Sequence, residues 1–339
     1  MYTQLHTQHT QQLRALLAQA KKAERPLGFA VTGSGLNAAT IVKGGVSFLM
    51  VLNAGVYRVA GCPSQIAFMP CGNANTQVEK LIRHQILPRC PGVPLVAGLL
   101  PNDPQCSLDT RFEILKTLGV AGVINWPPAS INSGRFWDAL RQRGFSEEEE
   151  RKALERAKEH GFVTFGFAST VPAAIELSKA DVDAMVVNLG WTLYETETLD
   201  KEDRTQYAIQ HTNALIASIQ ERVSREPVYF FYGGSISSPQ DMYKIYQKTK
   251  VDGYGAGSAL ELYPIRDYLQ SITQQFLHGG PERAGITYDR VDYPNFIGTS
   301  PPVAAMYTNI KRTAAYPVSV CVEGSPVWAR NSWPRCSTT

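Results

Sequence analysis

Eight short apolar segments recur along the chain, and each is closed by glycine, asparagine or proline. They cover residues 28–32, 48–53, 95–100, 121–125, 162–167, 183–188, 228–233 and 253–256, and helix-compatible stretches separate most of them. Continuous runs rich in Val, Ile and Phe are typical of parallel strands that are buried on both faces. Eight such strands alternating with helices predict an α/β fold, namely a closed (β/α)8 or TIM barrel.

The barrel leaves one segment at each end of the chain. Residues 11–23 carry leucines at helical spacing, which predicts a helix that caps the barrel or contacts a second subunit. After residue 278 prolines recur and the apolar periodicity weakens. We therefore expect an N-terminal helical extension over residues 1–26, a barrel domain over residues 27–278 and an irregular, Pro-rich C-terminal extension over residues 279–339.

Composition argues against several classes of partner. The 33 basic and 30 acidic residues give a net charge of +3 without a basic stripe, so we expect no nucleic acid as a partner. The sequence shows neither a cleavable signal nor a long uncharged apolar stretch, so we expect no membrane partner. The six cysteines form no C-x-x-C pair, which indicates a reducing compartment and a cytoplasmic location.

In a TIM barrel the loops that follow the strands carry the function, so the strand ends select the candidate site residues. The last two strands end in glycine-rich turns whose backbone N–H groups suit a phosphate or carboxylate. The first strand ends in a Gly-Ser turn that either presents N–H groups to a ligand or is only a tight turn. The predicted substrate-binding residues at these ends are Gly33, Ser34, Asn53, Asn125, Asn188, Gly233, Gly234, Ser235, Gly257 and Ser258.

Two charged residues follow strands. Arg58 is a candidate clamp for a carboxylate or phosphate, although a surface ion pair explains a single arginine equally well. Asp103 is a candidate ligand of Mg²⁺, and an Asx-turn before Pro104 is the alternative. We expect no organic cofactor.

Histidine is missing where catalysis would need it. The six histidines fall on predicted helices, helix ends or termini, so neither a zinc site nor a Ser-His-Asp triad is expected at the mouth. Cys71 is either a nucleophile or a small buried hydrophobe. The acidic run that opens residues 146–160 predicts a solvated helix, so we give its four glutamates no functional role.

An ordered set of motifs resembles the phosphoenolpyruvate hydrolase-like family, a TIM-barrel group related to the phosphoenolpyruvate mutase and isocitrate lyase superfamily. The motifs begin at Asn53 (NAGVYRVAG), Pro70 (PCGNAN), Val96 (VAG), Gly122 (GVINWP), Tyr232 (YGG) and Gly257 (GSALE). The resemblance covers residues 28–265 and adds Asn73 to the predicted substrate-binding residues. Relatives usually carry arginine at Val56, tyrosine at Cys71, aspartate at Asn73, and histidine at Asn188 and Tyr232, so the site here has fewer charged groups.

The resemblance implies a hydrolase or lyase that acts on a small anionic or enolic substrate, an oxoacid, enol or enol-phosphate, through an enolate. Hydrolysis of a C–C bond in a 1,3-dicarbonyl compound is a variant with the same intermediate. In this hypothesis Arg58 pairs with a carboxylate, Asp103 holds Mg²⁺ or water, and Tyr232 or Glu261 transfers protons. The competing hypothesis is a barrel that binds a small ligand without catalysis, and a Mg²⁺-dependent C–C lyase of the isocitrate lyase type is a weaker one. A homo-oligomer is expected, since barrels of this kinship tend to associate.

Overall fold

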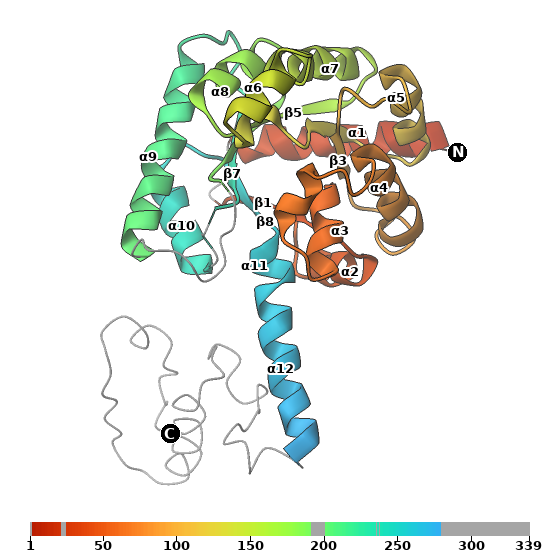
Figure 1. The fold of residues 1–339 in the computed structure, drawn as a ribbon, viewed down its shortest axis with the longest axis vertical. Helices are drawn as coiled ribbons and strands as arrows, with labels where there is room; N and C mark the ends of the chain where they lie inside the picture. The colour runs from red at the N-terminus through yellow and green to blue at the C-terminus, as the bar shows by residue number, and fades with distance from the viewer. Residues whose placement is uncertain (1, 22–24, 191–200, 235, 237, 279–339) are drawn as a thin grey trace. The chain divides into compact units, whose positions relative to one another are not determined.

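The computed structural model describes residues 2–21, 25–190, 201–234, 236 and 238–278. Within them eight strands pair in parallel and in sequence order, and the last strand pairs with the first, from Leu27 beside Gly253 to Ala30 beside Ala256. The ring of strands is therefore closed, and helices alternate with the strands around it (Figure 1). The predicted TIM barrel is confirmed.

The bounds of the elements are as follows. The strands are β1 Leu27–Val31, β2 Phe48–Val51, β3 Leu95–Leu99, β4 Gly122–Asn125, β5 Val163–Ala168, β6 Ala184–Asn188, β7 Val228–Tyr232 and β8 Gly253–Ala256. The α-helices are α1 Tyr2–Ala20, α2 Gly35–Lys43, α3 Asn53–Val59, α4 Ala74–Leu81, α5 Leu108–Thr117, α6 Arg135–Arg141, α7 Glu147–Glu159, α8 Val171–Ser178, α9 Lys201–Gln220, α10 Pro239–Lys248, α11 Ser258–Glu261 and α12 Tyr263–His278. Two 3-10 turns, η1 Ser64–Phe68 and η3 Ala129–Ile131, and a π-turn, η2 Ile82–Ile86, complete the described elements.

Two predicted segments have other bounds than expected. The strand predicted over residues 48–53 stops at Val51, because Asn53 is already the first residue of α3. Between β2 and β3, residues 74–86 form α4 followed by the π-turn η2. The N-terminal helix is longer than predicted, since α1 starts at Tyr2 and its polar first half gives no strong apolar signal.

Two apolar layers hold the barrel together. One lies between the strands and the surrounding helices, and the other fills the interior of the barrel. Four phenylalanines meet inside: the Phe29 ring stacks on Phe48 with centroids 5.3 Å apart and meets Phe230 edge-on at 5.5 Å, and Phe48 lies 5.6 Å from Phe165. β8 makes room for these rings, because a Cβ at Gly255 would lie 2.1 Å from the Phe29 ring.

Helix α1 closes one end of the barrel. Leu13 and Leu17 on this helix are buried in the same apolar layer as the phenylalanines inside the barrel. The His6 Nδ1 lies 2.7 Å from the carbonyl of Val120, and the His9 Nδ1 lies 2.9 Å from that of Gly119, just before β4 begins. The helix therefore covers the end at which the strands begin, and the loops of the mouth lie at the other end (Figure 1).

The chain separates into two compact units, residues 1–264 and 265–339. All eight strands lie in the first unit, and α12 begins in it and continues into the second. Among the described helices there is none with the length and hydropathy of a membrane span.

Candidate functional site

The mouth of the barrel is organised by hydrogen bonds between side chains of different loops. Two of its carboxylates are each held by an arginine, Glu261 by Arg58 and Asp103 by Arg111. All four side chains are nearly or fully buried. Buried charges are stable only when they are paired and hydrogen-bonded. The Arg58–Glu261 pair joins two different loops, whereas Arg111 and Asp103 belong to the same connection after β3.

Glu261, in the short helix α11 after β8, accepts five hydrogen bonds. Its Oε2 accepts from the Arg58 Nη2 at 2.7 Å and from the Arg58 Nε at 3.1 Å. Its Oε1 accepts from the hydroxyl of Thr32 at 2.7 Å, the backbone N–H of Gly33 at 2.8 Å and the side-chain amide of Asn37 at 3.2 Å. The carboxylate therefore joins the loops after β1, β2 and β8, and its oxygens are already occupied by donors of the chain.

Tyr232, at the end of β7, completes this group. Its phenol lies beside the guanidinium of Arg58, whose charge acts on it. Burial raises the pKa of the Tyr232 phenol, and the charge of Glu261 adds to that effect while Arg58 opposes it. At neutral pH this tyrosine is therefore a phenol that can donate a proton.

The glycine of the last loop lies against this tyrosine. A Cβ at Gly257 would lie 2.6 Å from the Tyr232 hydroxyl and 3.0 Å from the Arg58 Nη1. The glycine is thus explained by a close approach to the chain's own side chains. Ser258, which follows it, is buried at the start of α11.

The other predicted anion-binding glycines also meet groups of the chain. A Cβ at Gly233 would lie 2.7 Å from the Asn188 Oδ1, and the N–H of Gly234 donates to the carbonyl of Gly190 at 2.8 Å. Ser34 caps α2 by accepting from the N–H of Asn37. Ser235 lies outside the described residues. An anion-binding role for the predicted set Gly33, Ser34, Gly233, Gly234, Gly257 and Ser258 stays a prediction.

Asp103 lies in the loop after β3 and accepts four hydrogen bonds. Its Oδ1 accepts from the side-chain amide of Asn73 at 2.7 Å and from the N–H of Gln105 at 2.9 Å, and its Oδ2 accepts from Asn75 at 2.9 Å and from Arg111 at 3.2 Å. Burial by itself would raise the pKa of Asp103, but these donors and the charge of Arg111 outweigh it and lower the pKa. Asp103 is a carboxylate at neutral pH.

These surroundings do not fit the Mg²⁺ expected at Asp103. Magnesium requires several oxygen ligands, whereas the groups that face this carboxylate are N–H donors and a guanidinium. In the part of the chain that the structure describes, no three His, Cys, Asp or Glu side chains form a group that could hold a metal ion.

Asn53 links the loop after β4 to that after β2. Its Oδ1 accepts from the indole N–H of Trp126 at 2.8 Å, and its amide donates to the carbonyl of Ala67 at 3.2 Å and to Gln77 at 3.3 Å. Gln77 in turn donates to the hydroxyl of Tyr57 at 2.7 Å. Asn53 therefore fixes the positions of these loops.

The polar groups at the end of β4 are held by a glutamate to which the sequence analysis gave no functional role. Glu150, one of the four glutamates of the acidic run, is buried and not solvated, so that expectation was wrong for it. It accepts from the amide of Asn125 at 2.8 Å and from the N–H of Ala129 at 2.6 Å. Burial raises the pKa of Glu150 to about 8, although these two donors oppose the shift. A helical spacing of Glu150 with the buried Ala153, Leu154 and Ala157 was the available signal.

Asn188, at the end of β6, donates to the hydroxyl of Ser169 at 2.8 Å. The imidazole of His211 on α9 is hydrogen-bonded to the backbone of Asn188 and of Ser169, so a histidine from a helix reaches two strand ends. Burial lowers the pKa of His211, and the two backbone contacts partly offset this. Sequence spacing gives no signal for that contact, because α9 packs against the outside of the strands.

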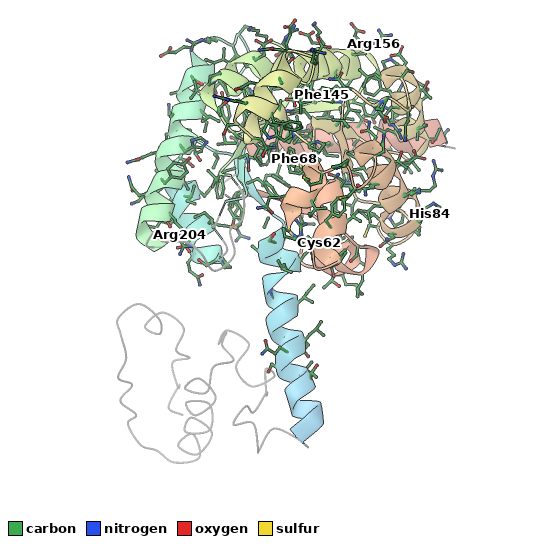
Figure 2. All side chains as sticks on the ribbon, viewed as in Figure 1. Cys62, Phe68, His84, Phe145, Arg156 and Arg204 are labelled. Atoms are coloured by element: carbon green, nitrogen blue, oxygen red, sulfur yellow. The ribbon has the colours of Figure 1, made fainter. Side chains whose placement is uncertain are left out.

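Aromatic side chains form a continuous series of ring contacts from Trp137 to Tyr232. Trp137 meets Phe68 at 5.9 Å between centroids, and Phe68 meets Trp126 at 5.8 Å. Trp126 meets Phe167 at 5.2 Å, and Phe167 meets Tyr232 at 5.9 Å. In Figure 2 the labelled Phe68 lies near the centre of the barrel unit. Phe136 and Met69, beside this series in the sequence, are exposed at 68% and 54%.

A hollow of about 450 Å³ lies elsewhere, between α9 and α10. Its lining includes Asn213, Gln220, Lys248 and Lys250, near the carboxyl ends of the two helices. Because the helices run opposite to the strands, this hollow lies at the end of the barrel away from the mouth.

Comparison with known proteins identifies the family to which the chain belongs. The model of the family "Phosphoenolpyruvate hydrolase-like" matches residues 12–278. A Sinorhizobium fredii protein, provisionally named transcriptional regulatory protein y4pA, is 27% identical over 318 residues, covering 92% of this chain and 52% of that protein. The ToMV resistance protein Tm-1(GCR237) of Solanum lycopersicum is 26% identical over 272 residues, covering 79% of this chain and 36% of its own length. The chain thus spans about half or less of these relatives.

Solved structures agree with the fold. A phosphoenolpyruvate phosphomutase from Streptomyces platensis subsp. rosaceus superposes with a TM-score of 0.52 at 13% identity, covering 90% of this chain and 99% of that one. At this identity the likeness concerns the barrel alone.

Proposed function

Since the chain belongs to the phosphoenolpyruvate hydrolase-like family, we propose that the mouth of its barrel is the active site of a hydrolase or lyase acting on a small oxoacid or enolic compound. As a hydrolase, it adds water to one carbonyl carbon, the adjacent C–C bond breaks to release a carboxylate and a proton, and the electron pair of that bond forms an enolate that is then protonated. As a lyase, a hydroxyl next to the broken bond loses its proton and becomes the carbonyl of the second product, and the same enolate forms. The observation that carries this proposal is the Tyr232 phenol, which lies at the end of β7 beside the buried pair of Arg58 and Glu261.

Tyr232 serves in this proposal as the acid. A phenol with a raised pKa donates a hydrogen bond to the oxygen that becomes negative, and its proton is available when the enolate is quenched. Arg58 stabilises the charge that the phenol gains as it gives up that proton. Glu261 acts as a positioning residue, because its five donors leave it no free lone pair with which to take a proton.

The pairing of Arg58 with Glu261 restricts the class of substrate that the mouth can bind. Arg58 is buried against Glu261, so a doubly charged phosphate has less to gain from it than a carboxylate or an enol. The aromatic series next to Tyr232 suits a flat, weakly polar body. A 1,3-dicarbonyl compound or a 2-oxoacid meets both conditions better than an enol-phosphate.

The test is a screen of 2-oxoacids, enol-phosphates and 1,3-dicarbonyl compounds with wild-type protein and two variants. Tyr232→Phe should lower kcat by about 10²-fold or more, the usual contribution of a general acid. Tyr229→Phe is the matched control, because the Tyr229 hydroxyl on the same strand is buried without a hydrogen-bond partner and its loss should leave kcat unchanged.

Turnover that is equal in wild type and Tyr232→Phe would contradict the proposed role. A compound that raises the melting temperature without being converted would favour the alternative of a barrel that binds a ligand without catalysis. Such binding, too, should weaken in Tyr232→Phe if the mouth is the site.

A further inference from the structure

We infer that Asp103 is not a metal ligand in this protein: it is a brace between loops, and the arrangement of its neighbours excludes a divalent cation. The inference concerns binding alone and stands independently of the proposed reaction. It departs from the Mg²⁺ site that the sequence suggested at this carboxylate.

The first argument is the use of the lone pairs of the carboxylate. An ionised carboxylate has about four acceptor positions, two on each oxygen. Here four donors fill them: the amides of Asn73 and Asn75, the N–H of Gln105 and the guanidinium of Arg111. A metal ion bound to either oxygen would have to displace one of these hydrogen bonds inside a side chain that is 2% exposed.

The second argument is that the two amides cannot turn their oxygens toward an ion. The Oδ1 of Asn73 accepts from the N–H of Thr76 at 2.9 Å, which caps the start of α4. The Oδ1 of Asn75 accepts from the N–H of Leu100 at 2.9 Å, and its amide nitrogen also donates to the carbonyl of Leu100 at 3.0 Å. Each amide therefore has its NH2 group fixed toward Asp103, and reversing it would leave two donors facing each other.

The third argument is charge. Arg111 donates to Asp103 at 3.2 Å and to Glu79 at 2.8 Å, and its side chain is 5% exposed. Arg83 pairs with Glu79 as well, at 2.9 Å. Two arginines thus balance two carboxylates, and a divalent ion at Asp103 would add positive charge beside the buried guanidinium of Arg111.

Asn73 is the residue at which this balance is most easily changed. An aspartate there would keep the cap on α4, because Asp and Asn are equally good N-caps. It would also replace an NH2 donor by a second carboxylate beside Asp103. Asn73→Asp is therefore the change that should convert the brace into a pair of carboxylates able to hold Mg²⁺ or Mn²⁺.

The experiment measures binding of Mg²⁺ and Mn²⁺ by calorimetry and by the shift of the melting temperature, in the full chain. Wild-type protein should show no saturable binding that depends on Asp103, and a chelator should leave its melting temperature unchanged. Asn73→Asp should gain saturable Mn²⁺ binding and a rise in melting temperature with Mn²⁺. Asn213→Asp, an amide-to-carboxylate change on α9 where it faces α10, should gain neither.

Two results would overturn the inference. One is saturable Mg²⁺ or Mn²⁺ binding by the wild type that is lost in Asp103→Asn. The other is an Asn73→Asp protein that folds with a native melting transition and gains no binding, because the fixed amide would then not be what excludes the ion. Wild-type binding that persists in Asp103→Asn lies elsewhere and upholds the inference. The wild-type measurement needs no variant, so a misfolded Asn73→Asp protein does not prevent the decision.

Discussion

Among single residues, Arg58 and Glu261 are the most tightly coupled charges at the mouth. Their side chains are exposed by 2% and 0% and are joined by two hydrogen bonds. From the sequence, Arg58 was expected to bind a substrate carboxylate and Glu261 to transfer protons. The structure brings the two together, and sequence spacing could not predict that partnership across 203 positions.

Removing one member of this pair should be costly. Arg58→Met leaves the Glu261 carboxylate buried without its counter-charge, so we expect the free energy of unfolding to fall by about 3–5 kcal/mol. The double variant Arg58→Met/Glu261→Leu should lose less, because neither charge is then left unpaired. Urea unfolding of the wild type and the three variants, Glu261→Leu included, measures both. A double variant that is as unstable as the sum of the single ones would contradict a direct coupling.

Glu150 should make stability depend on pH. Its pKa of about 8 lies above the ordinary glutamate value of 4.5, so between these pH values the folded protein keeps a proton that the unfolded chain releases. The free energy of unfolding is therefore expected to be higher at the acidic end of this window and to fall, by an amount of order a few kcal/mol, as the pH rises to about 8.

The measurement is urea unfolding of the wild type and Glu150→Gln at both ends of that window. The neutral glutamine should flatten the dependence relative to the wild type. Glu148→Gln serves as the control, since Glu148 lies two positions away on α7 and its side chain is 59% exposed. Equal slopes for the wild type and Glu150→Gln would show that Glu150 is not the group responsible.

At the scale of elements, β8 depends on glycine. A Cβ at Gly255 would lie 2.1 Å from the Phe29 ring, whereas nothing lies within 4 Å of a Cβ placed at Gly28 on the neighbouring strand. Strand ends and glycine-rich turns were readable in the sequence because they follow local patterns. The reason for glycine at position 255 was not readable, because the side chain that leaves no room there is Phe29, more than 200 positions away.

Gly255→Ala should therefore destabilise the barrel by about 1–3 kcal/mol, the usual cost of overpacking a core. Gly28→Ala is the matched control and should cost less, as its new methyl group meets no atom. Replacing Phe29 by leucine in the Gly255→Ala background should recover part of the loss. Thermal unfolding compares the variants, and equal losses for the two glycine changes would rule out the clash as the cause.

At the scale of the whole molecule, the barrel is complete within the first unit. Its eight strands, helix α1 and both arginine–carboxylate pairs lie within residues 1–264. The division at residues 26 and 278 and the homo-oligomer remain predictions. The family match ends at residue 278 as well.

A chain that stops after residue 278 should accordingly fold. We expect its far-ultraviolet circular dichroism to be that of a folded α/β protein. Its melting temperature should equal that of the full chain. Calorimetry of the shortened and full chains tests this, and light scattering of both reports whether residues 279–339 are needed for association. A shortened chain that aggregates or melts well below the wild type would place these residues among the determinants of stability.

The sequence by itself determined the barrel, the order of its strands and the loops that form its mouth, because hydrophobic period and turn residues act over short distances along the chain. Tertiary structure decided which polar groups of the mouth form hydrogen-bonded pairs with one another. Arg58 and Glu261 come from the loops after β2 and β8, and only closure of the strands brings them within hydrogen-bonding distance. Arg111 meets Asp103 and Glu150 meets Asn125 within a single connection, because the fold turns the helix of that connection toward the end of its strand. A buried charge takes whichever partner the fold presents, since leaving it unpaired costs more than any local preference.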